Sequence, residues 1–191
     1  MENLTDKKRA IFESTLELIK ENGFHGSPMS LVAKNAGVAA GTIYHYFESK
    51  DQLICELYAY NRRRIVDTIS RAIAEGLSYE EKFFKIWYNL YMFYIQNTNV
   101  LIFFEQYVNS PYNTNKCPSY FQGELFDFLL KGIEEGHIKD VKPEILVVLT
   151  LGSISSLAKL NMFGNITLKE TDLKQIVKIL WEGIVIHKTT F

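Results

Sequence analysis

The stretch from Pro28 to Leu53, PMSLVAKNAGVAAGTIYHYFESKDQL, decides the fold. Its pattern predicts one helix over 28–36 and a second, barely two turns long, over 40–47. Gly37 supplies the turn between them, because glycine adopts backbone conformations that other residues avoid. Two short helices around a glycine-bearing turn predict a helix-turn-helix over about 28–47.

Polar residues mark where the predicted helices begin. Thr5 is placed to cap the first helix of the chain. Ser27 is expected to cap the helix that starts at Pro28, where a missing N–H costs nothing. Ser49 and Gln52 form a capping box, with serine bonding forward and glutamine bonding back, and this box opens a long fourth helix.

Apolar residues at helical spacing continue through the rest of the chain, and no alternating strand pattern of useful length occurs. Further helices are predicted over 7–21, 49–73, 78–96, 100–108, 120–135, 143–163 and 168–187, with a loop over 109–119. The fold class is therefore all-α, with about nine helices. We expect a three-helix domain with the helix-turn-helix over 1–52, joined by the long fourth helix to a helical domain over 53–191.

The composition excludes several classes of protein. Hydrophobic residues make up 47% of the 191 residues, which excludes a disordered chain. No unbroken apolar run approaches the roughly 18 residues of a membrane-crossing helix, and the first residues do not read as a secretory signal. We therefore expect a cytoplasmic protein without a membrane partner. Cys55 and Cys117 lie in unrelated contexts, so neither a disulfide framework nor a metal site is predicted, and no cofactor is expected.

The net charge of −1 does not by itself indicate nucleic acid, so a case for DNA binding depends on where the donors lie. Three strings follow one another in the quoted stretch: Ala36-Gly37-Val38, then GTIYHYF over 41–47, then Ser49-Lys50. Joined in this order, they resemble the TetR family of bacterial repressors. The resemblance covers roughly the first quarter of the chain at the level of motifs.

The resemblance implies a sequence-specific, DNA-binding transcriptional regulator whose second motif helix enters the major groove. The implied DNA contacts are Thr42, Tyr44, His45, Tyr46 and Lys50, with Ser30 and Lys34 ranked below them. Elementary electrostatics independently supports a phosphate contact by Lys50. A helix N-terminus already carries amide donors and positive partial charge, and an added ammonium makes it a better phosphate-binding site.

The sequence departs from the common family pattern at the start of the second motif helix. Ala39 stands where a serine cap is frequent, and Ala40 stands where a polar DNA contact is frequent. A missing cap costs about 1 kcal/mol locally. The departure also reduces the number of direct DNA contacts.

The resemblance further implies an effector site in the C-terminal region, where aromatic residues are dense. Effector pockets are largely apolar with a few polar groups inside, so a small apolar or aromatic effector is expected. The candidate lining residues are Trp87, Tyr91, Phe103, Phe104, Tyr107, Tyr120 and Phe121, with Asn89, Glu105 and Gln106 as polar members. The alternative is that most of these aromatic residues are ordinary core, and that Glu105 is exposed.

The resemblance implies a homodimer formed by the helices over 143–163 and 168–187. The first of these helices has small residues that permit close approach, although packing within the chain would use them equally well: Gly152, Ser153, Ser155, Ser156 and Ala158. Two-fold symmetry would present two recognition helices to a palindromic operator. An effector that favours one of two dimer conformations would release the repressor from DNA. The expected location is the bacterial cytoplasm, in association with the nucleoid.

The sequence also bears on two other functions. An enzyme is not expected, because the chain has no HExxH, GxSxG, GxGxxG or Walker-type string. The alternative is an all-helical interaction module whose helix-turn-helix is only structural. The arginines over 62–64 lie about twelve residues beyond Lys50, or roughly 18 Å along a helix. Solvated or interdomain ion pairs therefore explain them better than direct DNA binding.

Overall fold

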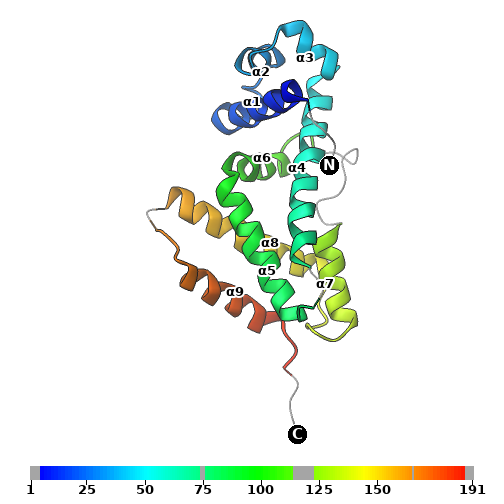
Figure 1. The fold of residues 1–191 in the computed structure, drawn as a ribbon, viewed down its shortest axis with the longest axis vertical. Helices are drawn as coiled ribbons and strands as arrows, with labels where there is room; N and C mark the ends of the chain where they lie inside the picture. Colours follow the sequence, from blue (N-terminus) through cyan, green and yellow to red (C-terminus); the bar gives the residue numbers. More distant parts are fainter. Residues whose placement is uncertain (1–4, 74–75, 114–122, 165, 188–191) are drawn as a thin grey trace. The chain divides into compact units, whose positions relative to one another are not determined.

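The computed structural model describes residues 5–73, 76–113, 123–164 and 166–187, and Figure 1 shows their arrangement. Within these ranges helices are the only regular elements, and one isolated bridge joins Ile138 and Val185. The predicted all-α fold class is confirmed. The helices are α1 (Asp6–Asn22), α2 (Met29–Asn35), α3 (Ala40–Tyr46), α4 (Lys50–Ala72), α5 (Tyr79–Gln96), α6 (Thr98–Val108), α7 (Glu124–Glu134), α8 (Pro143–Phe163) and α9 (Glu170–Ile184).

The chain forms two compact units. Unit 1 comprises residues 1–62 and 97–118, and unit 2 comprises residues 63–96 and 119–191. The division falls inside α4, and it assigns α6 to the same unit as α1, α2 and α3. The boundary predicted from the sequence, between 52 and 53, concerns where the DNA-binding part ends and remains a prediction.

Unit 1 owes the placement of α6 to contacts with α1 and α4. The Gln106 side chain donates a hydrogen bond of 3.1 Å to the carbonyl of Ile19, in the last turn of α1. The Tyr107 ring is stacked on the Tyr58 ring of α4 at 4.5 Å, and the Phe104 ring meets the same tyrosine edge-on at 5.4 Å. Because aromatic pairs bury large apolar areas, α6 is a structural part of unit 1.

Unit 2 is built around α5, which packs against α8 and α9, while α7 packs against α8. Trp87 on α5 is fully buried. Its indole N–H donates to Ser153 Oγ on α8 at 3.0 Å, so the one polar group of this side chain is satisfied inside the unit.

Tyr79, at the start of α5, is the aromatic centre of unit 2. Its ring stacks on Phe128 of α7 at 4.4 Å and on His137 at 4.7 Å, and it lies 6.0 Å from Trp181 of α9. Its hydroxyl donates to the Phe128 carbonyl at 3.1 Å. Burial, with a smaller contribution from the Glu135 carboxylate, raises the pKa of this phenol well above its usual range.

The segment after α7 holds the end of α9. The Lys139 amide donates to the Ile184 carbonyl at 2.8 Å, and its ammonium donates to the Gly183 carbonyl at 2.8 Å. The Ile186 amide returns a bond of 3.3 Å to His137. These bonds satisfy carbonyls that a helix C-terminus leaves free.

The predicted helix starts are correct at some positions and wrong at others. Thr5 caps α1, since its hydroxyl accepts from the Lys8 amide at 3.3 Å. Ser49 accepts from the Gln52 amide at 3.2 Å, as expected of a capping box. Ser27 is not the cap of α2, because its buried hydroxyl turns back to donate to the Phe24 carbonyl at 2.9 Å.

The bounds of the last helices also differ from prediction. Helix α7 spans Glu124–Glu134, with Gly123 at its N-cap position. The predicted helix start at 120 and most of the predicted loop fall within 114–122, outside the described residues. Helix α9 spans 170–184 and not 168–187, because the residues after Ile184 pair with the segment at 137–139.

Of the described residues, α8 forms the one helix that is long and apolar enough to cross a membrane by composition. The sequence of α8 is not an unbroken apolar run, because serine, threonine and lysine interrupt it. Its apolar composition extends to its outward face, where Ile145, Val148, Leu149 and Phe163 are each at least 47% exposed.

We predict that Gly132→Ala destabilises the protein by about 1–3 kcal/mol, the usual cost of overpacking. A Cβ at this position would collide with the Tyr79 hydroxyl and ring. In a Tyr79→Leu background the same methyl meets no ring, so the two losses should be less than additive. Urea denaturation measures the free energy of unfolding of all four proteins.

Gly183→Ala is the matched control, because a Cβ at this position meets no described atom within 4 Å. It should leave stability unchanged or raise it by up to about 1 kcal/mol, since alanine is the better helix former. Wild-type stability in Gly132→Ala would contradict the close packing of Tyr79 on α7.

Candidate nucleic-acid interface

Helices α2 and α3 and the turn between them form a helix-turn-helix in unit 1. Gly37 takes a φ of 66°, a left-handed conformation that glycine adopts without strain. The Val38 amide then donates to the Ala33 carbonyl at 3.0 Å, which closes the end of α2. Ser14 of α1 donates to the Val32 carbonyl at 3.1 Å and fixes α2 on the first helix.

Helix α3 is held by apolar burial and not by a cap. Ala39 occupies its N-cap position, and no side chain bonds its first amides, as the sequence predicts. Ile43 and Phe47 are fully buried, and the Phe47 ring lies 5.7 Å from that of Phe12 on α1. Because so short a helix is unstable alone in water, this burial keeps α3 helical and fixes its direction.

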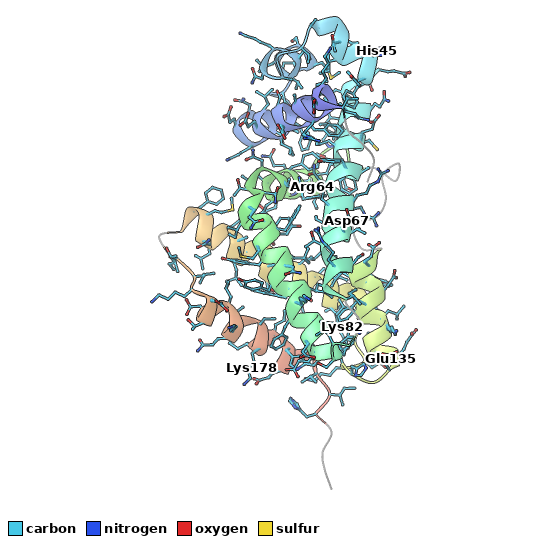
Figure 2. All side chains as sticks on the ribbon, viewed as in Figure 1. His45, Arg64, Asp67, Lys82, Glu135 and Lys178 are labelled. Atoms are coloured by element: carbon cyan, nitrogen blue, oxygen red, sulfur yellow. The ribbon has the colours of Figure 1, made fainter. Side chains whose placement is uncertain are left out.

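The predicted DNA contacts on α3 divide into outward and supporting side chains. Tyr44 is 55% exposed, and His45 is also exposed; Figure 2 labels His45 on α3. Thr42 and Tyr46 are half-buried. The Tyr46 hydroxyl accepts a bond of 3.3 Å from the hydroxyl of Thr5, the cap of α1. Tyr46 therefore also joins α3 to the beginning of the first helix.

The two lower-ranked candidates lie on α2. Ser30 and Lys34 are both exposed, near the first and last turns of that helix. The contacts that fix α2, described above, come from Ser14 and from the buried residues Val32 and Ala33 of α2.

Lys50, which the sequence predicts to contact a phosphate, also makes a contact within the chain. Its ammonium donates to the carbonyl of Phe24, in the segment between α1 and α2, and the side chain is half-buried. Burial lowers the pKa of this amine, and the neighbouring Asp51 carboxylate opposes that effect. An ammonium has three donors, so one bond to a carbonyl leaves donors for a phosphate.

Sequence reasoning missed Lys8, which links three helices of the motif. Its ammonium lies 2.8 Å from the Glu56 carboxylate of α4. It also lies over the rings of Phe12 and Phe47, at 5.8 and 5.5 Å from their centroids. No spacing rule could have found this site, because the partners are brought together only by folding.

The aromatic effector candidates fall in both units. Trp87 and Tyr91 belong to α5 in unit 2, and their rings stack at 5.7 Å. Phe103, Phe104 and Tyr107 belong to α6 in unit 1, and all five side chains are buried. Tyr120 and Phe121 lie outside the described residues.

The polar candidates for the effector site are Gln106, Glu105 and Asn89, and the structure gives a contact or a degree of burial for each. Gln106 binds the Ile19 carbonyl and thereby serves the contact between α1 and α6. Glu105 and Asn89 are half-buried.

Of the arginines over 62–64, Arg64 packs within unit 2, because its guanidinium lies 5.2 Å from the Phe93 ring centroid. Among the described residues no group of His, Cys, Asp or Glu could hold a metal ion.

A helix-turn-helix with polar and aromatic side chains directed outward from its second helix defines the class of DNA-binding regulators. Comparison with known families agrees. Residues 11–57 match the family model described as bacterial regulatory proteins, tetR family, and residues 78–185 match the one described as tetracyclin repressor-like, C-terminal domain. The chain belongs to the TetR family and is a helix-turn-helix transcriptional regulator. The family consists of regulators and not enzymes.

Individual relatives cover nearly the whole chain. An HTH-type transcriptional regulator of Haemophilus influenzae is 27% identical over 94% of this chain and 96% of its own length. The structure of a TetR family regulator from Marinobacter aquaeolei superposes with a TM-score of 0.89, covering 95% of this chain and 97% of that one at 20% identity. FadR from Bacillus subtilis, solved with stearoyl-CoA, has a TM-score of 0.65 at 22% identity over 91% of this chain and 95% of its own.

We predict that Ala39→Ser stabilises the protein by about 0.5–2 kcal/mol, because a serine hydroxyl at the N-cap can accept from the first free amides of α3. Thermal unfolding monitored by circular dichroism measures the change. Ala40→Ser is the control, since it lies inside the helix and is exposed. An equal gain in both variants would mean that capping is not what α3 lacks.

Proposed function

We propose that this regulator is a repressor that binds a palindromic operator as a homodimer and is released by a small apolar or aromatic effector. The observation that carries the proposal is the two-sided character of α3. One side, with Ile43, is buried, while Tyr44 and His45 face outward. A rigid helix with exposed donors is what reading of the major groove requires.

The proposed DNA contacts fall into two groups, those that reach base edges and those that reach phosphates. Thr42, Tyr44, His45 and Tyr46 extend from α3 toward base edges and nearby phosphates, and Lys50 donates to a phosphate from the start of α4. Ser30 and Lys34 add backbone contacts from α2. Phosphate contacts fix the register of the protein on the duplex, whereas base contacts select the sequence.

The outward face of α8 supports a dimer. Ile145, Val148, Leu149 and Phe163 follow one another at helical spacing and are all exposed. On α9, Ile179 is 70% exposed. Contiguous apolar surface of this kind marks an interaction site. Regulators of this family dimerise, so we assign the face to a second copy, through α8 and α9.

Gly152 and Ser156 lie near the middle of that α8 face. Among the described residues, a Cβ at Gly152 would meet no atom within 4 Å, and Ser156 is exposed. Glycine inside a helix costs about 1 kcal/mol relative to alanine, and no close neighbour among the described residues requires glycine at this position. We propose that two copies of α8 cross here, where small residues let the backbones approach.

The effector would bind in the C-terminal region and favour a dimer conformation that no longer fits the operator. Its candidate contacts remain Trp87 and Tyr91 in unit 2 and, separately, Phe103, Phe104 and Tyr107 in unit 1. Tyr120 and Phe121, outside the described residues, stay candidates from the sequence. The stearoyl-CoA of the Bacillus subtilis neighbour supports an effector with a large apolar part. Regulators of this family are typically cytoplasmic, and operator binding would place this one on the nucleoid.

We predict that Tyr44→Ala weakens operator binding about 10- to 100-fold, the effect of losing one or two hydrogen bonds to charged partners. Stability should change by less than about 0.5 kcal/mol, because the side chain is exposed. The probe is the chain's own upstream genomic fragment, or a duplex selected from random DNA, titrated across a salt series with competitor DNA. Tyr88→Ala, an exposed tyrosine of α5, is the control and should bind like the wild type.

Lys50→Ala tests the phosphate contact in the same titration. Its salt dependence should be shallower by about one released counterion per lost contact. Wild-type binding that is weak, insensitive to salt and unselective after random-sequence selection would overturn the proposal. The interaction module with a structural helix-turn-helix would then be favoured.

We predict that Ser156→Cys forms a disulfide between two copies under mild oxidation, in a background where Cys55 and Cys117 are serine. A residue beside a two-fold axis faces its own copy, and a disulfide needs Cβ atoms within about 4.5 Å. Phe163→Cys on the same face is the control. It lies seven residues, or about 10 Å, further along the helix and should not crosslink. Denaturing gels without reductant show the product.

The oligomeric state of the wild type decides which part of this proposal fails. A monomer by light scattering at micromolar concentration would overturn the dimer itself. A dimer in which Phe163→Cys crosslinks and Ser156→Cys does not would move the crossing point toward the end of α8.

A further inference from the structure

Phe24 contacts two parts of unit 1 with two different groups. It lies between α1 and α2, directly after Gly23, and its side chain is 7% exposed. The ring lies 5.9 Å from the Phe103 ring of α6 and 5.1 Å from the Tyr112 ring that follows α6. The side chain of Phe24 is therefore anchored in the α6 segment.

The main chain of Phe24 faces the helix-turn-helix. Its carbonyl accepts from the Lys50 ammonium at the start of α4 and from the Ser27 hydroxyl at 2.9 Å. A half-buried ammonium is poorly hydrated, so a carbonyl acceptor at this place determines where the charge lies.

A second contact ties the same segment to α6. Gln106 donates to the Ile19 carbonyl at 3.1 Å, and that carbonyl also accepts from the Gly23 amide at 2.9 Å. The end of α1 and the Phe24 ring are thus both attached to α6. We therefore expect a displacement of α6 within unit 1 to move the Phe24 carbonyl as well. Protein interiors are close-packed with few voids, so a shift of one packed group is transmitted to its neighbours.

We propose that Phe24 is a positioning residue for DNA binding, which transmits the position of α6 to the ammonium of Lys50. With α6 in the place seen here, the carbonyl holds Lys50 ready for a phosphate. When α6 moves, the carbonyl moves with it, the ammonium loses its acceptor, and the affinity for DNA falls. This inference depends on the proposed phosphate contact of Lys50.

A double-mutant cycle tests the proposal. Phe24→Leu keeps the carbonyl but removes the ring contacts, and Lys50→Met removes the charge but keeps an apolar stem. Operator affinity is measured for the wild type, both single variants and the double variant, with a duplex selected from random DNA by the wild-type protein. We expect Lys50→Met to weaken binding about tenfold and to make the salt dependence shallower.

The decisive comparison is the effect of Phe24→Leu in the two backgrounds. It should weaken binding about fivefold when Lys50 is present and less than about twofold in the Lys50→Met background, since coupled residues are not additive. A residue that merely supports the fold would cost the same affinity in both. Tyr60→Leu is the matched control, because the Tyr60 ring of α4 lies 5.3 Å from the Phe12 ring of α1 and belongs to the packing of α4 on α1, whereas Phe103 and Tyr112 are the rings that tie Phe24 to the α6 segment. Its effect should be equal in the two backgrounds.

The possible failures are distinguishable. Wild-type affinity and salt dependence in Lys50→Met would overturn the phosphate contact and the coupling together. A weakened Lys50→Met with equal effects of Phe24→Leu in both backgrounds would overturn the coupling alone. If Phe24→Leu does not fold by circular dichroism, Tyr112→Leu replaces it in the cycle. That variant removes one ring contact from the α6 side and should show the same dependence on Lys50.

Discussion

The DNA-binding surface depends on the burial of Ile43 and Phe47 beneath α3. A helix of this length has too few hydrogen bonds to offset its own nucleation, and α3 also lacks a side-chain cap. Packing on Phe12 therefore supplies the stability that local sequence does not. The ammonium of Lys8 covers the edge of this contact and reaches Glu56 on α4. The outward side chains keep a fixed direction only while this apolar contact stays closed.

Helix α6 lies in the same compact unit as the helix-turn-helix. Its aromatic residues were candidates both for core and for an effector site. The stack of Tyr107 on Tyr58 and the bond from Gln106 to α1 show that they hold unit 1 together. The two roles are compatible, because a ligand that displaces a packed helix acts on everything attached to it. An effector acting on α6 would not need a separate relay to reach the DNA-binding surface.

The sequence was sufficient to predict what depends on local pattern. The fold class, the bounds of α8 and the Thr5 cap follow from periodicity and capping chemistry within a few residues. Contacts between distant residues could not be predicted: Tyr46 with Thr5 spans 41 residues, Lys50 with Phe24 spans 26, and Gln106 with Ile19 spans 87. The wrong cap at Ser27 has the same origin, since its hydroxyl prefers a buried carbonyl of the preceding turn to the free amides ahead of it.

Two glycines inside helices, Gly132 and Gly152, differ in whether a neighbour within the described chain requires glycine at that position. Gly132 is required by the chain itself, because the Tyr79 ring occupies the space that a side chain would need. Gly152 has no such neighbour, yet it lies inside α8 among exposed apolar residues. A glycine that weakens its helix with no gain within the chain, on a face that leaves apolar surface in water, is accounted for when a second backbone lies against it. The dimer interface that we propose on the outer face of α8 would also account for the membrane-like composition of this helix, because protein would then cover its exposed apolar residues.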